Sequence, residues 1–210
     1  MNPIDKHEGK LFVISGPSGA GKGTICKELL AETSRDDVQL SVSMTTRNPR
    51  VGETDGVSYY FVTKEEFEQK IAADGLLEYA EVYGNYYGTP KQPVVEKLNA
   101  GIDVILEIDM QGALKVKENY PNGVFIFILP PSLAELRKRL TGRGTETPEA
   151  VEMRLGETLN ELTYIEQYDY YVVNHNLDEA VTQMKAILRA EGNRVTFTAE
   201  ELIFRFKEEA

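Results

Sequence analysis

The feature that most constrains this chain is the stretch 11–24, which reads LFVISGPSGAGKGT. Its first four residues are apolar, as in a buried strand, and a glycine-rich segment follows at 16–21. From Lys22 onward, Ile25 and Leu29 recur at helical spacing. A strand, a glycine-rich turn and a helix in this order are the setting of a phosphate-binding loop. The chain is therefore expected to be built on a strand–loop–helix unit that holds phosphate.

The chemistry of such a loop is local. Glycines let successive backbone N–H groups point at one anion, and the helix N-terminus adds its dipole and free N–H groups. Lys22 supplies a mobile positive charge for the outer phosphates. The competing interpretation, a tight glycine turn beside a surface lysine, is disfavoured because strand and helix flank the glycines correctly. The residues expected to bind phosphate here are Gly16, Pro17, Ser18, Gly19, Ala20, Gly21, Lys22, Gly23 and Thr24.

The loop departs from the usual pattern at one position. Gly23 follows Lys22 where a Ser or Thr hydroxyl ordinarily reaches Mg²⁺, and the hydroxyl comes one residue later, at Thr24. We therefore expect Mg²⁺ to be held mainly through water and substrate phosphates. Thr24 is a candidate protein ligand.

Composition narrows the possible partners. The chain has 210 residues, 41% hydrophobic and 27% charged, with a net charge of −11. This acidic balance argues against a nucleic acid or an anionic membrane as partner. The single cysteine, Cys26, excludes an intrachain disulfide and fits a reducing compartment. No signal peptide or membrane span is evident, so we expect a cytoplasmic protein.

Hydrophobic patterning predicts strands that alternate with helices, which is typical of a parallel sheet with helices on both faces. The block 41–92 mixes short strands with one helix and predicts an insert with its own small sheet. Within it, a capping box from Thr63 to Glu66 begins a helix, and residues 86–90 lead out after a strand at 76–82. A second capping box, from Thr198 to Glu201, begins a terminal segment. The remaining predictions are strands at 38–44, 59–62, 102–108, 124–129 and 170–174, and helices at 22–33, 93–100, 113–119, from 132, from 147 and at 177–191.

Asp109 stands directly after the predicted strand 102–108. Ligands of open α/β sheets bind at the carboxyl ends of the strands, so a carboxylate there would face the phosphate loop. An aspartate in that place organises Mg²⁺ in other phosphate-loop enzymes. The alternative is an aspartate that only stabilises a turn.

Two groups of arginines are candidates for phosphate binding. Arg47 and Arg50 lie three residues apart in a polar segment and suit a bidentate clamp on a dianionic phosphate. Arg139, Arg143 and Arg154 form a second group, with glycines beside Arg143 that would permit closure over a site. The alternatives are a solvated basic loop for the first group and glutamate-paired helix-surface arginines for the second.

Taken together, six motifs closely resemble the guanylate kinase family, which belongs to the P-loop nucleoside monophosphate kinases. They are GPSGAGKGT (16–24), SVSMTTRNPR (41–50), EVYGNYYGT (81–89), EIDMQGA (107–113), FILPPS (127–132) and KRLTGRGTET (138–147). Their order and spacing match over residues 10–190. The phosphate loop alone would indicate only nucleotide binding, whereas the six motifs jointly are specific.

The resemblance implies Mg²⁺-dependent transfer of the γ-phosphoryl group of ATP to GMP, giving ADP and GDP. It also implies three parts: a five-stranded parallel core formed by residues 1–40, 93–132 and 166–210, a GMP-binding insert at 41–92, and a helical lid at 133–165. ATP and GMP would be the partners, with Mg²⁺ as cofactor.

The family's site residues map onto this chain position by position. Arg47, Arg50, Tyr59 and Tyr87 resemble the ligands of the GMP phosphate, and Ser43, Glu78, Thr89 and Glu107 resemble the groups that bind guanine. Lys22 and the rest of the loop 16–24 resemble the site of the ATP phosphates, and Asp109 resembles the acid near Mg²⁺ and both substrates. Arg139, Arg143 and Arg154 resemble the lid arginines, of which Arg143 would also bind ATP, and Asn174 resembles the residue near adenine. The expected catalytic set is Lys22, Arg47, Asp109, Arg139, Arg143 and Arg154.

Nucleobase chemistry agrees with this assignment. Guanine offers N1–H and its 2-amino group as donors and O6 as an acceptor, so the Glu78 carboxylate suits the donors. The hydroxyls of Ser43 and Thr89 can meet O6, and an unmatched buried polar pair costs about 1–3 kcal/mol. At position 107 the family has Asp and this chain has Glu, which keeps the carboxylate but reaches one methylene further.

Two other functions are considered. A catalytically silent guanylate-kinase-like domain that binds a phosphopeptide or protein would be expected to lose the phosphate loop, whereas this chain keeps Gly16, Gly21 and Lys22. A kinase acting on another nucleotide such as AMP is disfavoured by the guanine-matching residues.

Overall fold

The computed structural model describes residues 8–34, 37–82, 84–142, 147–195 and 199–208. Its main sheet has the strand order β2-β7-β1-β8-β9, and every neighbouring pair is parallel. The strands are β1 (Leu11–Ser15), β2 (Val38–Leu40), β7 (Asp103–Glu107), β8 (Val124–Leu129) and β9 (Tyr170–Val173). The predicted five-stranded parallel sheet is confirmed.

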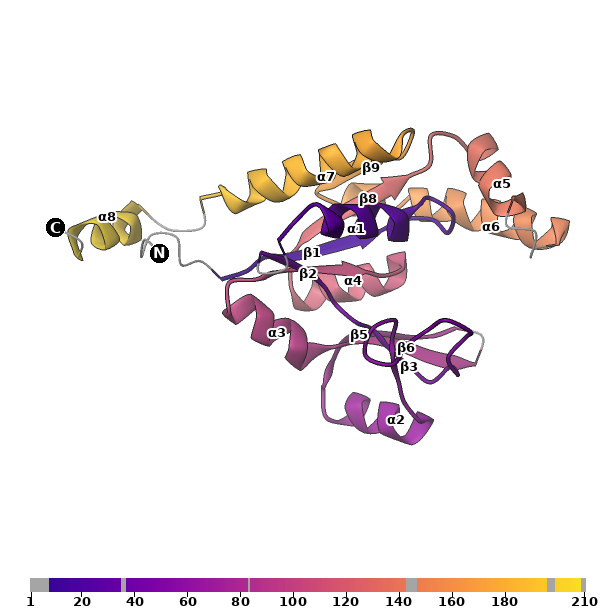
Figure 1. Cartoon of the computed structure of the whole chain (residues 1–210), viewed down its shortest axis with the longest axis horizontal. Helices are drawn as coiled ribbons and strands as arrows, with labels where there is room; N and C mark the ends of the chain where they lie inside the picture. The colour runs from indigo at the N-terminus through magenta and orange to yellow at the C-terminus, as the bar shows by residue number, and fades with distance from the viewer. Residues whose placement is uncertain (1–7, 35–36, 83, 143–146, 196–198, 209–210) are drawn as a thin grey trace.

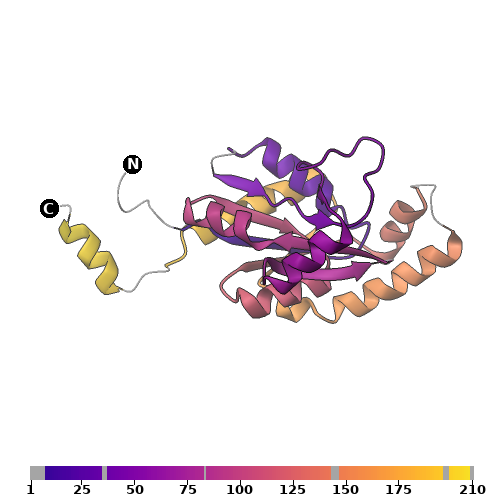
Figure 2. The same cartoon turned by 90° about the horizontal axis from the view of Figure 1, so that it is seen from below.

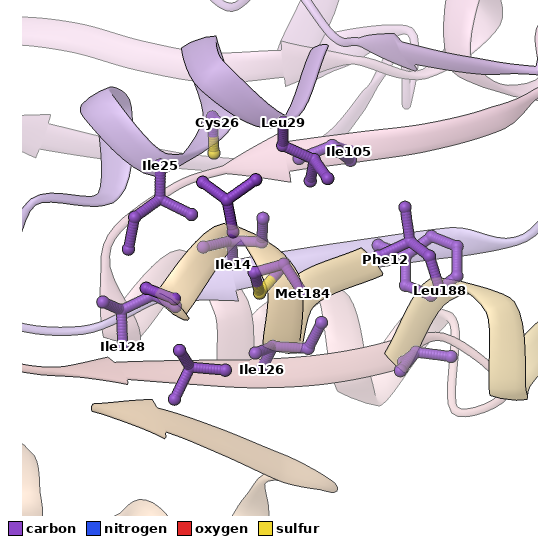
Figure 3. Packing of buried hydrophobic residues seen from close by; sticks show 14 of the residues in the cluster. Phe12, Ile14, Ile25, Cys26, Leu29, Ile105, Ile126, Ile128, Met184 and Leu188 are labelled. Carbon is purple, nitrogen blue, oxygen red and sulfur yellow. The ribbon is translucent and has the colours of Figure 1, made fainter. Parts of the chain in front are cut away.

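Helices cover both faces of this sheet (Figure 1). Alternate residues of β1 point to opposite faces, as the pleat requires. Phe12 and Ile14 pack against α1 (Lys22–Ala31) and α7 (Leu177–Gly192), and Figure 3 shows this cluster around Met184. Leu11 and Val13 pack on the other side with α3 (Lys91–Asn99) and α4 (Met110–Asn119). Because β1 pairs in parallel with β7 and β8, the loop that follows it leaves the sheet at the edge where those strands also end.

A second, four-stranded sheet is formed by part of the predicted insert. Its order is β4 (Tyr60–Phe61), β3 (Met44–Thr45), β6 (Asn85–Pro90) and β5 (Leu76–Val82). Strands β3 and β4 are parallel, and the other pairs are antiparallel. The helix α2 (Lys64–Ala72) begins with the predicted capping box, in which Thr63 and Glu66 exchange side-chain and backbone hydrogen bonds.

Two sequence predictions about strands are wrong. The alternation over 38–44 predicted one strand, but the structure places β2 and β3 in different sheets. Alternation records which side chains are buried, not which sheet buries them. Residues 86–90, expected to lead out of the strand at 76–82, instead belong to β6, although a glycine and a proline weaken a strand. Gly88 is required there, since a Cβ atom would come 2.8 Å from the Glu78 carbonyl oxygen.

Some helix ends also differ from the prediction. The first helix ends at residue 31, two residues early, and α3 begins two residues before Pro93, which therefore lies in its first turn. The helix α4 begins three residues earlier than predicted, because Asp109 caps it.

Two further helices, α5 (Leu133–Thr141) and α6 (Pro148–Leu162), form a small cluster of their own through Leu136, Leu140, Val151 and Leu155. They lie at the opposite end of the molecule from α8 (Ala199–Glu208), as Figure 2 shows. A short 3₁₀ turn, η2 (Ile165–Gln167), leads from α6 into β9. The predicted cap Thr198 lies outside the described residues. None of the helices in the described ranges has both the length and the hydropathy that a membrane crossing requires.

Candidate functional site

The glycine-rich loop connects the carboxyl end of β1 to α1. Gly16 has φ +137°, and a Cβ atom there would come 2.2 Å from the Ile128 carbonyl oxygen of β8. Gly21 has φ +97°, and a Cβ atom there would come 2.3 Å from Asn174 Nδ2. Both positions combine a left-handed backbone with a close neighbour, so only glycine fits. The backbone of the loop therefore packs closely against the carboxyl end of β8 and against Asn174, which follows β9.

Lys22 lies inside the curve of this loop. Its Nζ donates to the carbonyl oxygen of Gly16 at 2.5 Å and to that of Pro17 at 3.2 Å. Burial lowers the pKa of Lys22, and the carboxylates of Glu107, Glu161 and Asp109 act in the opposite direction. The ammonium group is thus held by backbone acceptors that an incoming phosphate could replace.

Arginines from α5 and α6 reach the outer side of the loop. Arg139 donates from Nη2 to the Asn174 carbonyl oxygen at 3.0 Å and from Nη1 to that of Ala20 at 3.4 Å. The Asn174 Nδ2 amide donates to the same Ala20 oxygen at 2.8 Å. Arg154 Nη1 donates to Ser18 Oγ at 2.9 Å. Two of the three predicted lid arginines and Asn174 therefore meet at the loop, and Arg143 lies outside the described residues.

The acid Glu78 lies on β5 and is buried, with 8% of its surface exposed. Thr89 Oγ1 of β6 donates to Glu78 Oε1 at 2.8 Å. Desolvation raises the pKa of Glu78 to about 7; the Thr89 hydrogen bond opposes this shift and the negative charge of Asp109 adds to it. A Cβ atom at Gly112 would come 2.9 Å from Glu78 Oε2, so the carboxylate lies directly against the start of α4. Two predicted guanine-binding residues therefore form one buried hydrogen-bonded unit.

A β-bulge places Glu78 in this position. Between Leu76 and Tyr79 the register of β5 shifts by one residue relative to residues 88–90 of β6. Consequently Leu77 packs in the core cluster with α3 and α4 while its neighbour Glu78 is also buried. An extra residue of this kind redirects side chains, and bulges are frequent beside active sites.

Asp109 and Thr24 are the predicted protein ligands for a metal ion. The Asp109 side chain caps α4, with Oδ1 accepting from the Gly112 N–H at 2.7 Å. The turn-stabilising interpretation therefore holds for one of its oxygens. Thr24 is exposed in the first turn of α1. Within the described ranges no cluster of three or more His, Cys, Asp or Glu side chains could hold a metal ion. This donor set fits Mg²⁺, which usually takes one or two carboxylates and fills its shell with water and substrate phosphate.

The predicted phosphate clamp contains an acid that the sequence analysis missed. Arg47 Nη2 donates to Glu53 Oε1 at 2.8 Å, and Nη1 donates to the Asn48 carbonyl oxygen at 2.7 Å. The other Glu53 oxygen, Oε2, accepts from the Arg50 N–H at 2.7 Å. Hydrogen bonds to Arg47 and to the Arg50 backbone hold the pKa of Glu53 below its usual range. An acid six residues after one arginine and three after the other, in a polar loop, was the available signal.

Aromatic rings complete this part of the site. The Arg47 guanidinium lies 5.6 Å from the centre of the Tyr59 ring and 5.9 Å from that of Phe61. The Tyr59 and Tyr87 rings meet edge to face at 6.1 Å. Two predicted phosphate-binding tyrosines are therefore adjacent to one predicted arginine. The Arg50 residue is exposed, and Ser43 lies half-buried on the link from β2 to β3.

Glu53 gives a first testable prediction. Glu53→Gln keeps the shape but removes the charge that orients Arg47, so KM for a phosphate-bearing acceptor is expected to rise roughly 3–10-fold. Steady-state kinetics with varied acceptor would measure this, with Glu65→Gln on α2 as a matched exposed control. An equal rise in both variants would contradict a positioning role for Glu53.

Comparisons with known proteins agree with this geometry. The family model described as guanylate kinase matches residues 8–191. A guanylate kinase of Clostridium perfringens (strain SM101 / Type A) is 59% identical over 204 residues, covering 97% of this chain and 94% of the relative. One from Clostridium acetobutylicum is 57% identical and covers 93% and 92%. The crystal structure of a guanylate kinase from Anaplasma phagocytophilum superposes with a TM-score of 0.73 at 36% identity, covering 90% and 89%.

Proposed function

The chain belongs to the guanylate kinase family and is an ATP:GMP phosphotransferase, and we propose that the residues described above divide the work of that reaction among them. The observation that carries this proposal is the pairing of a complete phosphate loop with a buried Glu78–Thr89 unit. The silent binding-domain alternative is not favoured, because the relatives that this chain matches over nearly their whole length are guanylate kinases.

On the ATP side, the loop 16–24 binds the phosphates through its backbone N–H groups and the N-terminus of α1. Lys22 exchanges its carbonyl partners for phosphate oxygens. Arg139 and Arg154, with Arg143 beyond the described residues, add positive charge near the transferred group, and Asn174 lies on the adenine side. Support comes from the contacts of Arg139 and Arg154 with the loop itself.

On the GMP side, we propose that Arg47, Arg50, Tyr59 and Tyr87 bind the phosphate. The base is bound by Ser43, Glu78, Thr89 and Glu107. The Glu78 carboxylate accepts from N1–H and the 2-amino group of guanine. Adenine, with an unprotonated N1, would leave this buried acid unmatched, which is a strong basis for discrimination.

The family reaction generally requires a divalent metal ion, and we propose Mg²⁺ as that ion. Asp109 and Thr24 would hold it together with water and the substrate phosphates. When bound, Mg²⁺ neutralises charge on the phosphates. Asp109 could hold the metal ion while it caps α4, because its hydrogen bond with the Gly112 N–H engages one carboxylate oxygen, Oδ1, and leaves Oδ2 for the metal ion.

The remaining catalysis is positioning. A GMP phosphate oxygen attacks the γ-phosphorus in line, no side chain forms a covalent phosphoenzyme, and Lys22 with the arginines offsets the charge.

We propose that the chain is divided into a core (1–40, 93–132, 166–210), a GMP-binding insert (41–92) and a lid (133–165). Closure of the insert and the lid over the core would exclude water. The separate sheet of the insert and the separate hydrophobic cluster of α5 and α6 support this division. As a consumer of ATP and GMP, the enzyme is proposed to work in the cytoplasm.

An acceptor panel tests the proposal. Purified protein with ATP and Mg²⁺ would be offered GMP, AMP, UMP and CMP in a coupled ADP-release assay. Turnover is expected with GMP and to be at least about 10²-fold slower with AMP, since the buried polar groups would be unmatched. Binding of GMP without turnover would favour the silent domain, and comparable turnover with AMP would contradict the role of Glu78.

A further inference from the structure

Thr45 lies at the point where β3 ends and the chain leaves the small sheet. Strand β3 runs beside β6 (Figure 1), and its last residue, Thr45, is in register with Tyr87. Thr45 is fully buried. Burial of a hydroxyl group is unfavourable unless the group is hydrogen-bonded, so the partners of this hydroxyl account for its place in the interior.

The Thr45 hydroxyl bonds to both sides of this junction. Its Oγ1 donates to the Tyr86 carbonyl oxygen of β6 at 2.8 Å. The same Oγ1 accepts from the Arg47 N–H at 3.2 Å, two residues further along the chain. A hydroxyl can donate one hydrogen bond while it accepts another, so both contacts exist together. Thr45 therefore ties the backbone of Arg47 to the strand that carries Tyr87.

The neighbouring hydroxyl, that of Thr46, makes a different contact. Thr46 Oγ1 accepts from the Tyr86 N–H at 2.9 Å, and the Thr46 N–H donates to the Tyr86 carbonyl oxygen at 3.1 Å. Both threonines thus fasten this segment to β6. Among the hydrogen bonds of the described residues, however, the Arg47 N–H is bonded by the hydroxyl of Thr45 and not by that of Thr46. The two positions therefore differ in the one contact that matters here.

Arg47 needs such a contact because it lies beyond the end of β3, where the strand ladder no longer fixes its backbone. Its guanidinium lies 5.6 Å from the centre of the Tyr59 ring, which meets Tyr87 edge to face. Hydrogen bonds to a phosphate weaken steeply when donor and acceptor are misaligned, so an arginine and tyrosines that share one phosphate must keep a fixed separation.

We propose that the Thr45 hydroxyl is a positioning group for the acceptor phosphate, which holds Arg47 in place relative to Tyr87. Because Thr45 is fully buried, it acts through Arg47 and not by contact with the substrate. Glu53 holds the guanidinium end of Arg47, and Thr45 holds its backbone end. The inference rests on the proposed function, in which Arg47 and Tyr87 bind the GMP phosphate.

Removal of the hydroxyl alone tests this role. Thr45→Val keeps the shape of the side chain without its hydroxyl, Thr45→Ser keeps the hydroxyl, and Thr46→Val is the matched control from the adjacent position. Thr45→Ala is a second hydroxyl-free variant, with less bulk, for use if the valine variant does not fold. Steady-state kinetics with GMP and ATP varied in turn, and thermal unfolding, would be measured on the same samples.

Thr45→Val and Thr45→Ala are expected to raise KM for GMP roughly tenfold, with kcat and KM for ATP within about twofold of wild type. Thr45→Ser and Thr46→Val are expected to stay within about threefold of wild type in KM for GMP, because each keeps the hydroxyl that bonds to the Arg47 N–H. When Arg47→Ala is already present, Thr45→Val is expected to add less than about twofold, because the residue through which it acts has lost its guanidinium.

A wild-type KM for GMP in the folded hydroxyl-free variants would overturn the inference. So would an equal rise in Thr46→Val, a serine variant as impaired as the valine variant, or an undiminished effect of Thr45→Val beside Arg47→Ala. A parallel rise in KM for ATP would make Thr45 a structural residue only. Wild-type protein that does not phosphorylate GMP, or an Arg47→Ala variant with unchanged KM for GMP, would instead contradict the proposed function, so the two failures are distinguishable.

Discussion

Replacing Lys22 with alanine is expected to lower kcat by roughly 10³-fold while the protein remains folded. In the described part of the chain the Nζ atom donates hydrogen bonds to the Gly16 and Pro17 carbonyl oxygens, both in its own loop, so its loss breaks no hydrogen bond between distant described elements. Burial of the charged ammonium opposes folding, as its lowered pKa indicates, so the unfolding temperature should not fall. Phosphoryl transfer depends mainly on positive charge around the transferred group, which alanine cannot supply.

Steady-state kinetics and thermal unfolding on the same samples would measure both effects. Lys27→Ala, on an exposed position of the same helix, controls for loss of a lysine from α1. KM for GMP should change little in either variant. Near-normal kcat in folded Lys22→Ala protein would remove this lysine from the catalytic set.

Glu78→Gln is expected to raise KM for GMP by roughly 10–100-fold, with a smaller effect on KM for ATP. The amide keeps the size of the side chain and can still pair with Thr89 Oγ1, but it presents an N–H group where guanine also donates. Steady-state kinetics with GMP and ATP varied in turn would measure the change in each KM separately. Glu81→Gln, on the exposed part of the same strand, is the control. An equal loss for both substrates would make Glu78 a structural residue.

The same variant should change how stability depends on pH. Because the folded-state pKa of Glu78 is raised from 4.5 to about 7, the folded protein holds this proton over a range in which the unfolded chain has lost it. Its contribution is full below pH 4.5 and is lost as pH rises through about 7. Relative to Glu78→Gln, wild type should therefore lose roughly 3 kcal/mol of unfolding free energy over this range. Denaturant unfolding at pH 5 and pH 8 would show it, and parallel curves for the two proteins would contradict it.

GMP binding should follow the opposite trend. Guanine donors need the ionised acid, so GMP affinity of the wild type should increase from pH 6 to pH 8 by more than that of Glu78→Gln. The comparison matters because a nucleotide phosphate also titrates near pH 6. A shared pH profile would show that only the phosphate is responsible.

The sequence predicted the main sheet well because its strands are buried on both faces. Strand 124–129 is continuously apolar and was predicted at its observed ends. Strands were predicted less well where the pattern of buried residues along the chain does not correspond to a single strand in one sheet. Residues 38–44 alternate correctly but cross between sheets, and β6 contains a glycine and a proline that only its packing explains.

For the site, local signals and family motifs named most of the candidate residues, but not their partners. The Glu53 carboxylate was missed because its signal was only its spacing after Arg47 and Arg50, which is too common in polar loops to single out one acid. A Cβ atom on Gly23 would come 3.2 Å from Glu107 Oε1, and this proximity could not be predicted from the sequence either, since it depends on the pairing of β1 with β7. Such relations are set by strand order, which a linear pattern does not contain.

The bulge in β5 also bears on how accurately the proposed guanine site could select its base. Leu77 is fixed among Val94 and Val116 in the interior, and the next residue is Glu78. Because Glu78 directly follows Leu77, its backbone is held by a close-packed interior. Its carboxylate is therefore expected to vary less in position than one on a surface loop. Selective recognition needs groups held to within about 0.5 Å. With Glu78 in its proposed role, the fidelity of nucleotide choice would therefore depend on how tightly the protein interior is packed.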